Sequence, residues 1–192
     1  MSERTGTAAF AHPSADAVFA ELYRRHHRPI RDFCRRRVDR HLVDDAVAET
    51  FLTAWRRLDA IPAGAEALVW LYRVAYRVIG HQRRAFARRR RLEDRLRSVA
   101  PLPVAAADES IADGDEFRLV LAAAARLGEH DAEVLRLTAW EHLSVADIAA
   151  VLEIDPNAVK QRLYRARQNL GREFRRLQSH RTTPVAAKGG ER

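Results

Sequence analysis

The stretch SVADIAAVLEIDPNAVKQRLYRARQNL, residues 144–170, decides the fold of the C-terminal part of the chain. Ser144 is a good N-cap residue, and Asp147 follows three positions later, as in a capping box. Asp155 caps a second helix, and Pro156 takes its first position, where a missing N–H loses no hydrogen bond. The stretch therefore predicts two helices joined by a short turn.

The apolar residues of the second helix fix which of its sides faces solvent. Val159, Leu163, Ala166 and Leu170 recur at helical spacing and form the buried stripe. The residues left to point outward are Lys160, Gln161, Tyr164, Arg165 and Gln168. Arginine and lysine suit guanine, glutamine suits adenine, and tyrosine can touch a phosphate or a thymine methyl group. We interpret the stretch as a helix-turn-helix whose second helix lies in the major groove; a helical hairpin with a solvated basic face is the alternative.

The turn departs from the usual pattern at one position. Glu153 stands where many such turns have glycine. A positive φ at a glutamate costs about 1 kcal/mol, so we expect a slightly altered turn.

Composition points to a polyanionic partner. The chain has 192 residues, 47% of them hydrophobic, with a net charge of +8 and a pI of ≈ 10.6. Nucleic acid is the first candidate for such a balance and an anionic membrane the second. Arginine carries almost all of the positive charge, and its planar group suits phosphate and guanine.

The charge is also partitioned along the chain. Residues 70–97 contain ten arginines against two acids, and residues 160–181 contain eight cations against one acid. Residues 98–159, between them, contain three arginines against twelve acids. Two separate cationic segments predict two contact points on one polyanion, because a general solubility device needs no such partition.

The whole chain has a helical pattern, which predicts an all-α fold of two small domains. Alternation typical of strands is not sustained in any segment. Pro29 lies within the first long helical pattern and is expected to kink or split it. The linker, residues 98–115, is rich in proline, small residues and acids, and is expected to be flexible. The domains are predicted at residues 15–97 and 116–177, with helices at about 67–96, 116–127 and 156–177 and a disordered tail at 178–192.

Catalytic and metal-binding patterns are weak in this sequence. His26, His27 and Cys34 lack the spacing of a paired ligand set. Paired acids such as Asp44 and Asp45 are typical of a helix start, where they complement the helix dipole. We therefore expect no enzyme activity, no cofactor and no metal.

One cysteine, no secretory signal and no long apolar run predict a soluble cytoplasmic protein without membrane insertion.

Two segments together resemble a known family. DDAVAETFLTAWRRL (residues 44–58) and WLYRVAYRVIGHQRRAFARRRR (residues 70–91) resemble the second region of bacterial RNA polymerase sigma factors. LSVADIAAVLEIDPNAVKQRLYRARQNL (residues 143–170) resembles their fourth region. Only the short linker joins the two, which is similar to the extracytoplasmic-function, or group IV, subfamily.

The resemblance implies binding to core RNA polymerase and promoter-specific initiation of transcription. The fourth region would read the minus-thirty-five element and contact the polymerase flap. The implied DNA contacts are Lys160, Gln161, Arg162, Tyr164 and Arg165. An anti-sigma factor is a further possible partner of such proteins.

The second region would bind the clamp helices of the polymerase and would recognise and melt the minus-ten element. The implied polymerase contacts are Asp45, Glu49, Thr50 and Phe51, with Ala48 where glutamine is common. The implied minus-ten contacts are Arg73, Tyr76, Arg77, Arg84 and Arg88, with Arg77 where many members have asparagine.

Melting requires a surface that prefers the single strand, with arginines on phosphates and aromatic rings on unstacked bases. Trp70, Tyr72 and Tyr76 are candidates for such stacking. Trp70 and Tyr72 cannot both face DNA at this spacing, and we expect Trp70 to be the buried one. Trp55 is expected in the core.

Two other functions remain open at this point. A self-sufficient helix-turn-helix regulator would dimerise and read a palindrome, but it would not need the second basic helix. A helical adaptor would bind acidic proteins or a membrane through its basic helices.

Overall fold

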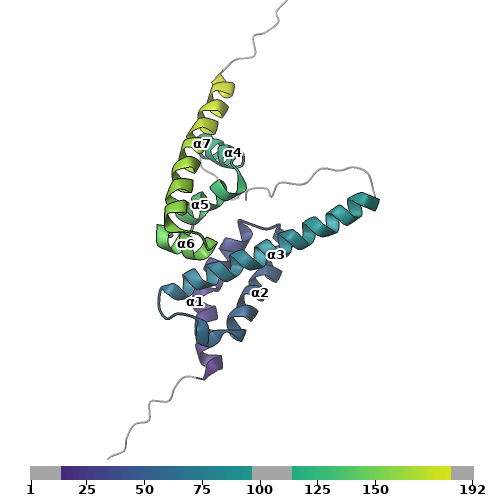
Figure 1. Cartoon of the computed structure of the whole chain (residues 1–192), viewed down its shortest axis with the longest axis vertical. Coiled ribbons are helices and arrows are strands. Elements are labelled where there is room, and N and C mark those ends of the chain that lie inside the picture. The colour runs from purple at the N-terminus through teal and green to yellow at the C-terminus, as the bar shows by residue number, and fades with distance from the viewer. Residues whose placement is uncertain (1–13, 97–113, 183–192) are drawn as a thin grey trace, which may run out of the picture. The chain divides into compact units, whose positions relative to one another are not determined.

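A computed structural model describes residues 14–96 and 114–182, and these residues form helices and turns without a strand. The predicted all-α fold class is confirmed for this part of the chain (Figure 1). Two 3₁₀ turns, Arg40–Leu42 and Leu58–Ala60, accompany the helices. The helices are α1 (Ala15–Arg35), α2 (Val43–Arg56), α3 (Glu66–Leu96), α4 (Asp115–Ala124), α5 (Glu129–Ala139), α6 (Val145–Leu152) and α7 (Pro156–Thr182).

The described residues fall into two compact units that divide between His81 and Gln82, inside α3. We use "first unit" for α1, α2 and α3 as far as His81, and "second unit" for α4 to α7. Helix α3 continues to Leu96 past the first unit. Residues 98–113 of the predicted linker and residues 183–192 of the predicted tail lie outside the described residues.

The core of the first unit is made by one apolar stripe from each of its three helices. Helix spacing places these stripes inward, and the Phe33 ring of α1 stacks on the Tyr72 ring of α3 at 4.9 Å between centroids. Arg37 is buried as well, with its guanidinium 3.6 Å from the Phe33 ring centroid. Core members include Ile30, Phe33, Cys34, Val47, Phe51, Ala54, Leu71, Ala75 and Ile79.

Two expectations about α1 and α3 are corrected by this packing. Helix α1 runs continuously through Pro29, so the predicted split does not occur, and buried Ile30 and Phe33 hold the following turn in place. Tyr72 is the buried aromatic residue of α3, with 5% of its surface exposed, whereas Trp70 is half-buried. The prediction had the two reversed, because it did not foresee that Phe33 would stack on Tyr72.

The core of the second unit forms where α4, α5 and α6 all pack against α7. Its fully buried side chains come from every one of these helices. They include Ala123, Val134, Leu137, Ile148, Val151, Val159 and Ala166.

The ends of two helices differ from their predicted positions. Helix α4 begins at Asp115 and ends at Ala124, where residues 116–127 were predicted. Helix α7 continues to Thr182, inside the segment predicted to be a disordered tail. The next helix-breaking residue is Pro184, so the chain can propagate the helix past Leu177.

Candidate nucleic-acid interface

Local capping fixes the two helices of the helix-turn-helix as the sequence predicts. The Ser144 hydroxyl accepts the Asp147 N–H at 3.1 Å, and the Asp147 carboxylate accepts the Ser144 N–H at 3.2 Å, a complete capping box. The Asp155 carboxylate accepts the Asn157 N–H at 2.7 Å at the start of α7. Two exposed helix starts are therefore satisfied within a few residues of sequence.

The turn between α6 and α7 keeps a left-handed residue at Glu153, where an altered turn was expected. Glu153 has φ 56° and ψ 46°, the left-handed conformation that glycine adopts most readily. The Ala149 carbonyl closes the turn by accepting the N–H of Glu153 and, at 3.1 Å, that of Ile154. Ala149 is buried, and its small side chain suits the close approach of the two helices.

Helix α7 presents four of the predicted minus-thirty-five residues together on one exposed face. Val159, Leu163 and Ala166 are buried, which fixes the rotation of the helix about its axis. Tyr164 is 67% exposed, an unusual position for a large aromatic side chain. A shallow hollow of ≈ 390 Å³ is lined by Lys160, Gln161, Tyr164 and Arg165, which we call the recognition face. Arg162 is half-buried and does not line this hollow.

The chemistry of the recognition face matches DNA rather than an apolar ligand. Its lining contains two cations, one amide and one phenol, and no acid. Cations attract the phosphate backbone, whereas the amide and the forked guanidinium can form paired hydrogen bonds with base edges. This face can therefore bind and discriminate duplex DNA.

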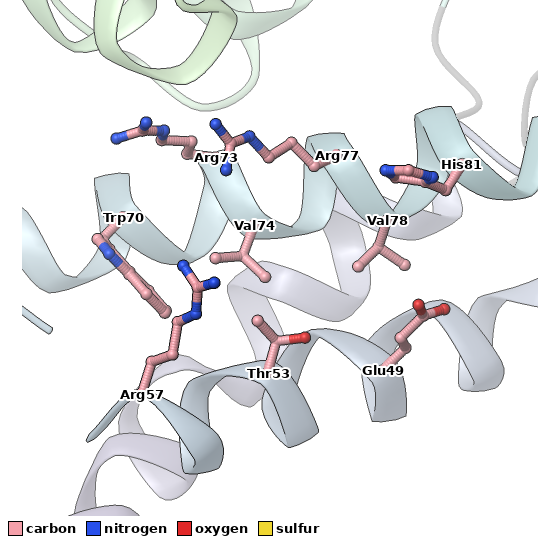
Figure 2. Close-up of a pocket in the computed structure, with 9 residues that line it drawn as sticks. All are labelled: Glu49, Thr53, Arg57, Trp70, Arg73, Val74, Arg77, Val78 and His81. Carbon is pink, nitrogen blue, oxygen red and sulfur yellow. The ribbon is translucent and has the colours of Figure 1, made fainter. Parts of the chain in front are cut away.

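A second hollow lies in the first unit, in the groove between α2 and α3. It has a volume of ≈ 270 Å³. Figure 2 shows α2 and α3 facing each other across it, with Val74 and Val78 directed toward α2. The residues that line this α2–α3 groove are Glu49, Thr53, Arg57, Trp70, Arg73, Val74, Arg77, Val78 and His81.

Charge is distributed unevenly along the α2–α3 groove. Arg57 and Trp70 face each other at one end, with the Arg57 guanidinium directed toward α3 (Figure 2). Glu49 lies toward the other end, opposite Val78 and His81 (Figure 2). The end at Arg57 and Trp70 thus places a positive charge beside an aromatic ring.

The predicted minus-ten residues divide between this groove and the rest of α3. Arg73 and Arg77 line the groove, and Tyr76 is half-buried outside its lining. Arg84 and Arg88 are exposed on the part of α3 that continues past the first unit. The structure brings two of the five predicted residues to the groove and leaves three elsewhere on the helix.

Sequence reasoning missed Arg57 and His81 as groove residues. Glu49 and Thr53 lie on one face of α2, and Arg57, which follows the last residue of the helix, continues the same spacing of four. That spacing was visible in the sequence. It would have identified the face if the partner helix had been known.

The residues predicted to contact core polymerase separate into exposed and buried pairs. Asp45 and Glu49 are exposed on α2. Thr50 is fully buried and its hydroxyl donates to the Ala46 carbonyl at 2.7 Å, while Phe51 is 3% exposed. The structure therefore places Thr50 and Phe51 in the core and leaves Asp45 and Glu49 as the exposed members of the predicted set.

An aromatic and aliphatic surface lies beside these residues on α1 and α2. Trp55, expected in the core, is 41% exposed and contacts Phe19 edge-on at 5.0 Å between ring centroids. Tyr23 packs on Phe51 at 4.7 Å, yet it is 41% exposed. Leu52 is also exposed. The first unit therefore has an apolar surface next to the exposed acids of α2.

Burial shifts the pKa of two groups of the first unit toward the neutral form. Burial raises the pKa of the Cys34 thiol to about 12, although Arg37 nearby acts in the opposite direction. Burial, with a smaller contribution from Arg25, lowers the pKa of His26.

Within residues 14–96 and 114–182, no group of three or more histidine, cysteine or acidic residues is arranged to hold a metal ion. None of the helices described there is long and apolar enough to cross a membrane.

Comparison with known proteins identifies the family. Residues 22–95 match the family model of sigma-70 region 2, and residues 117–170 match that of sigma-70, region 4. RNA polymerase sigma factor CnrH of Cupriavidus metallidurans is 34% identical over 136 residues, which cover 67% of this chain and 71% of the relative. The chain belongs to the sigma-70 family of RNA polymerase sigma factors.

Other relatives place this sigma factor in the extracytoplasmic-function (ECF) group. The ECF RNA polymerase sigma-E factor of Haemophilus influenzae is 25% identical over 168 residues, which cover 83% of this chain and 89% of the relative. A solved structure of CnrH in complex with the cytosolic domain of CnrY has a TM-score of 0.54 and 28% identity, and the match covers 80% of this chain and 84% of that one. The protein is an ECF sigma factor that directs transcription initiation, and sigma factors are non-enzymatic subunits of RNA polymerase.

Proposed function

We propose that this sigma factor divides promoter recognition between its two units. The recognition face of α7 reads the minus-thirty-five element as duplex DNA. The cationic surface of α3 recognises the minus-ten element and holds one of its strands after melting. The protein works in the cytoplasm as part of the polymerase holoenzyme.

The observation that carries this proposal is the grouping of four predicted DNA contacts around one exposed hollow. Lys160, Gln161, Tyr164 and Arg165 were singled out because a buried stripe forced them outward. In the structure they are exposed and line the same hollow. A helix whose N-terminal turns carry such residues has the form that enters a major groove.

Helix α3 offers different contacts, suited to a strand rather than a duplex. Arg73 and Arg77 line a groove that also contains the half-buried ring of Trp70. Stacking of a base on an aromatic ring contributes about 1–3 kcal/mol and is possible only for an unpaired, accessible base. Arg84 and Arg88 extend the cationic surface along the helix, where they can follow phosphates.

Contact with core polymerase is assigned to the exposed surface of α2. Asp45 and Glu49 are the charged residues for the clamp helices, and Leu52 and Trp55 supply exposed apolar area on the same helix. Apolar area surrounded by charges is typical of a protein–protein contact. The second unit is assigned to the polymerase flap.

An anti-sigma factor is a further proposed partner. The solved relative CnrH is in complex with the cytosolic domain of CnrY. By analogy, a protein of that kind would hold this sigma factor away from polymerase until a signal releases it.

Transcription with purified core polymerase tests the proposal. Promoters are first selected from a random library with the reconstituted holoenzyme, and each is then assayed with and without its upstream element. Specific initiation that depends on both the protein and the core enzyme is the expected result. Tight binding to a palindromic duplex without polymerase would favour the stand-alone helix-turn-helix regulator instead. If the protein shows neither specific initiation nor such binding, the helical adaptor is the function that is left.

A further inference from the structure

The α2–α3 groove contains a guanidinium group that the predicted minus-ten contacts do not include. Arg57 follows the last residue of α2 and lines the groove together with Trp70 and Arg73. We infer that Arg57 positions the melted strand by binding the phosphate of a nucleotide whose base lies against Trp70. This inference rests on the proposed function and names a strand contact contributed by α2.

The backbone at Arg57 is held by hydrogen bonds on both sides. The Arg57 N–H donates to the Ala54 carbonyl at 3.1 Å, and the Arg57 carbonyl accepts the Ala60 N–H at 2.9 Å. Ala54 is completely buried. The backbone of Arg57 is thus held by α2 on one side and by a 3₁₀ turn on the other, which fixes the point from which its side chain enters the groove.

Trp70 is held in place by its neighbours on α3. Ala67 and Leu71 are buried, and Tyr72 is directed into the core against Phe33. Successive residues of a helix are about 100° apart around its axis, so burial of Leu71 and Tyr72 leaves Trp70 at the edge of the groove. Figure 2 shows its ring and the Arg57 side chain approaching the same end of the groove from opposite helices.

The size and charge of the groove favour a single nucleotide over a duplex or a peptide helix. Its volume of ≈ 270 Å³ is at the small end of the range for ligand sites and is suited to one base rather than to a helix. Three arginines line it and Glu49 is its one acid, toward the end away from Arg57. An arginine binds a phosphate with two parallel hydrogen bonds, which gives direction as well as affinity.

Arg56 provides a matched control for Arg57. It is the last residue of α2, it is exposed, and it does not line the groove. An alanine at either position removes the same charge from the same part of the surface. Long-range attraction is therefore reduced equally by the two substitutions, and only a direct contact distinguishes them.

The experiment uses holoenzyme and two probes from a promoter selected with the wild-type protein. One probe is a fork with a duplex upstream element and a single-stranded minus-ten segment, and the other is fully duplex and contains only the upstream element. Arg57→Ala should weaken fork binding about tenfold and reduce the slope of log affinity against log salt by about 1. Arg56→Ala should change fork binding less than twofold, and neither substitution should change binding to the upstream duplex.

A neutral methylphosphonate, substituted in turn for each phosphate of the single strand, identifies the phosphate that Arg57 binds. At one position it should weaken wild-type binding as much as Arg57→Ala does, and it should weaken the Arg57→Ala protein no further. The inference would be overturned if the methylphosphonate and Arg57→Ala weakened fork binding additively at every position. It would also be overturned if Arg56→Ala and Arg57→Ala weakened fork binding equally while both proteins kept the wild-type circular dichroism spectrum. Failure of the wild-type holoenzyme itself to bind the fork or initiate would overturn the proposed function as well.

Discussion

The recognition face of α7 and the α2–α3 groove are both cationic, but they are built in different ways. The recognition face comes from one helix, and its residues lie within six positions of sequence, from Lys160 to Arg165. The groove needs two helices, and its residues extend from Glu49 to His81. An exposed face on one helix suits a duplex groove, whereas a smaller hollow between two helices suits a single nucleotide.

The two units also differ in the core contacts that position each surface. The second unit places its recognition face by burying α7 against three other helices. The first unit places its groove by the contact of Phe33 with Tyr72 across two helices. If the units are independent, damage to one core should leave the other surface working.

The largest effect is expected from Phe33→Ala. Removal of this fully buried ring should destabilise the first unit by about 3–5 kcal/mol, because it leaves a cavity beside Tyr72. Unfolding in urea can be followed for the second unit by Trp140 fluorescence in a Trp55→Phe, Trp70→Phe background, and for the first unit by Trp55 and Trp70 fluorescence in a Trp140→Phe background. The Trp140 transition should keep its midpoint while the first unit unfolds earlier.

Ile30→Val serves as the graded control, with an expected loss of about 0.5–1.5 kcal/mol. Binding of the isolated protein to the upstream duplex should survive Phe33→Ala. A Trp140 midpoint that moves together with the first unit would show that the two units unfold as one, and the comparison between them would fail.

Arg165→Ala should have the next largest effect, and on DNA binding rather than on folding. Loss of one base-reading arginine weakens binding by about 1–3 kcal/mol and relaxes specificity at one position. The reduction should appear on promoters that contain the upstream element. Transcription from matched promoters with and without that element provides the measurement.

Arg118→Ala is the control for charge, because Arg118 is exposed on α4 and lies outside the recognition face. It should change both promoters by less than twofold. Equal losses on the two promoters after Arg165→Ala would mean that this residue does not read the upstream element.

The recognition face could be predicted from the sequence more fully than the α2–α3 groove, because it is formed by a single helix. Capping at Ser144 and the start of α7 at Pro156 depend on residues a few positions apart, and the structure shows both as predicted. Of the four residues predicted for the buried stripe of α7, Val159, Leu163 and Ala166 are buried and Leu170 is half-buried. One helix with one apolar side has only one reasonable orientation.

The groove could not be predicted in this way, because both sides of α3 carry large apolar or aromatic residues. Trp70 and Tyr72 lie about 200° apart on the helix, and Phe33 of α1 decides which of them is buried. Thr50 and Phe51 were named because they match the polymerase-binding motif of the family, and a motif match does not show that both side chains lie in the core. Arg57 became a groove residue only through its position opposite Trp70.

Ser144→Ala should have a smaller effect, and it compares two N-cap serines, one in each unit. Ser144 belongs to a full capping box, and its loss should destabilise the second unit by about 1 kcal/mol. Ser14 caps α1 with one hydrogen bond of 3.2 Å from the Ala17 N–H. Ser14→Ala should therefore destabilise the first unit by less.

Urea denaturation with the unit-specific reporters distinguishes these two outcomes. Ser144→Ala should lower the Trp140 midpoint only, and Ser14→Ala the first-unit midpoint only. A larger loss from Ser14→Ala would indicate that local capping is not what distinguishes the second unit.

The smallest effect is expected from Glu153→Gly. Glu153 adopts φ 56°, where a residue with a Cβ is strained and glycine is not. The substitution should stabilise the second unit by about 0.5–1 kcal/mol, offset in part by the greater freedom of glycine in the unfolded chain. Gly64 in the first unit has φ 69° and gives the opposite test, because Gly64→Ala should destabilise that unit by a similar amount.

Denaturation midpoints measure both changes, and affinity for the upstream duplex should stay the same in Glu153→Gly. If that affinity falls instead, the strained turn contributes to the placement of the recognition face, and the face then depends on more than the buried stripe of α7.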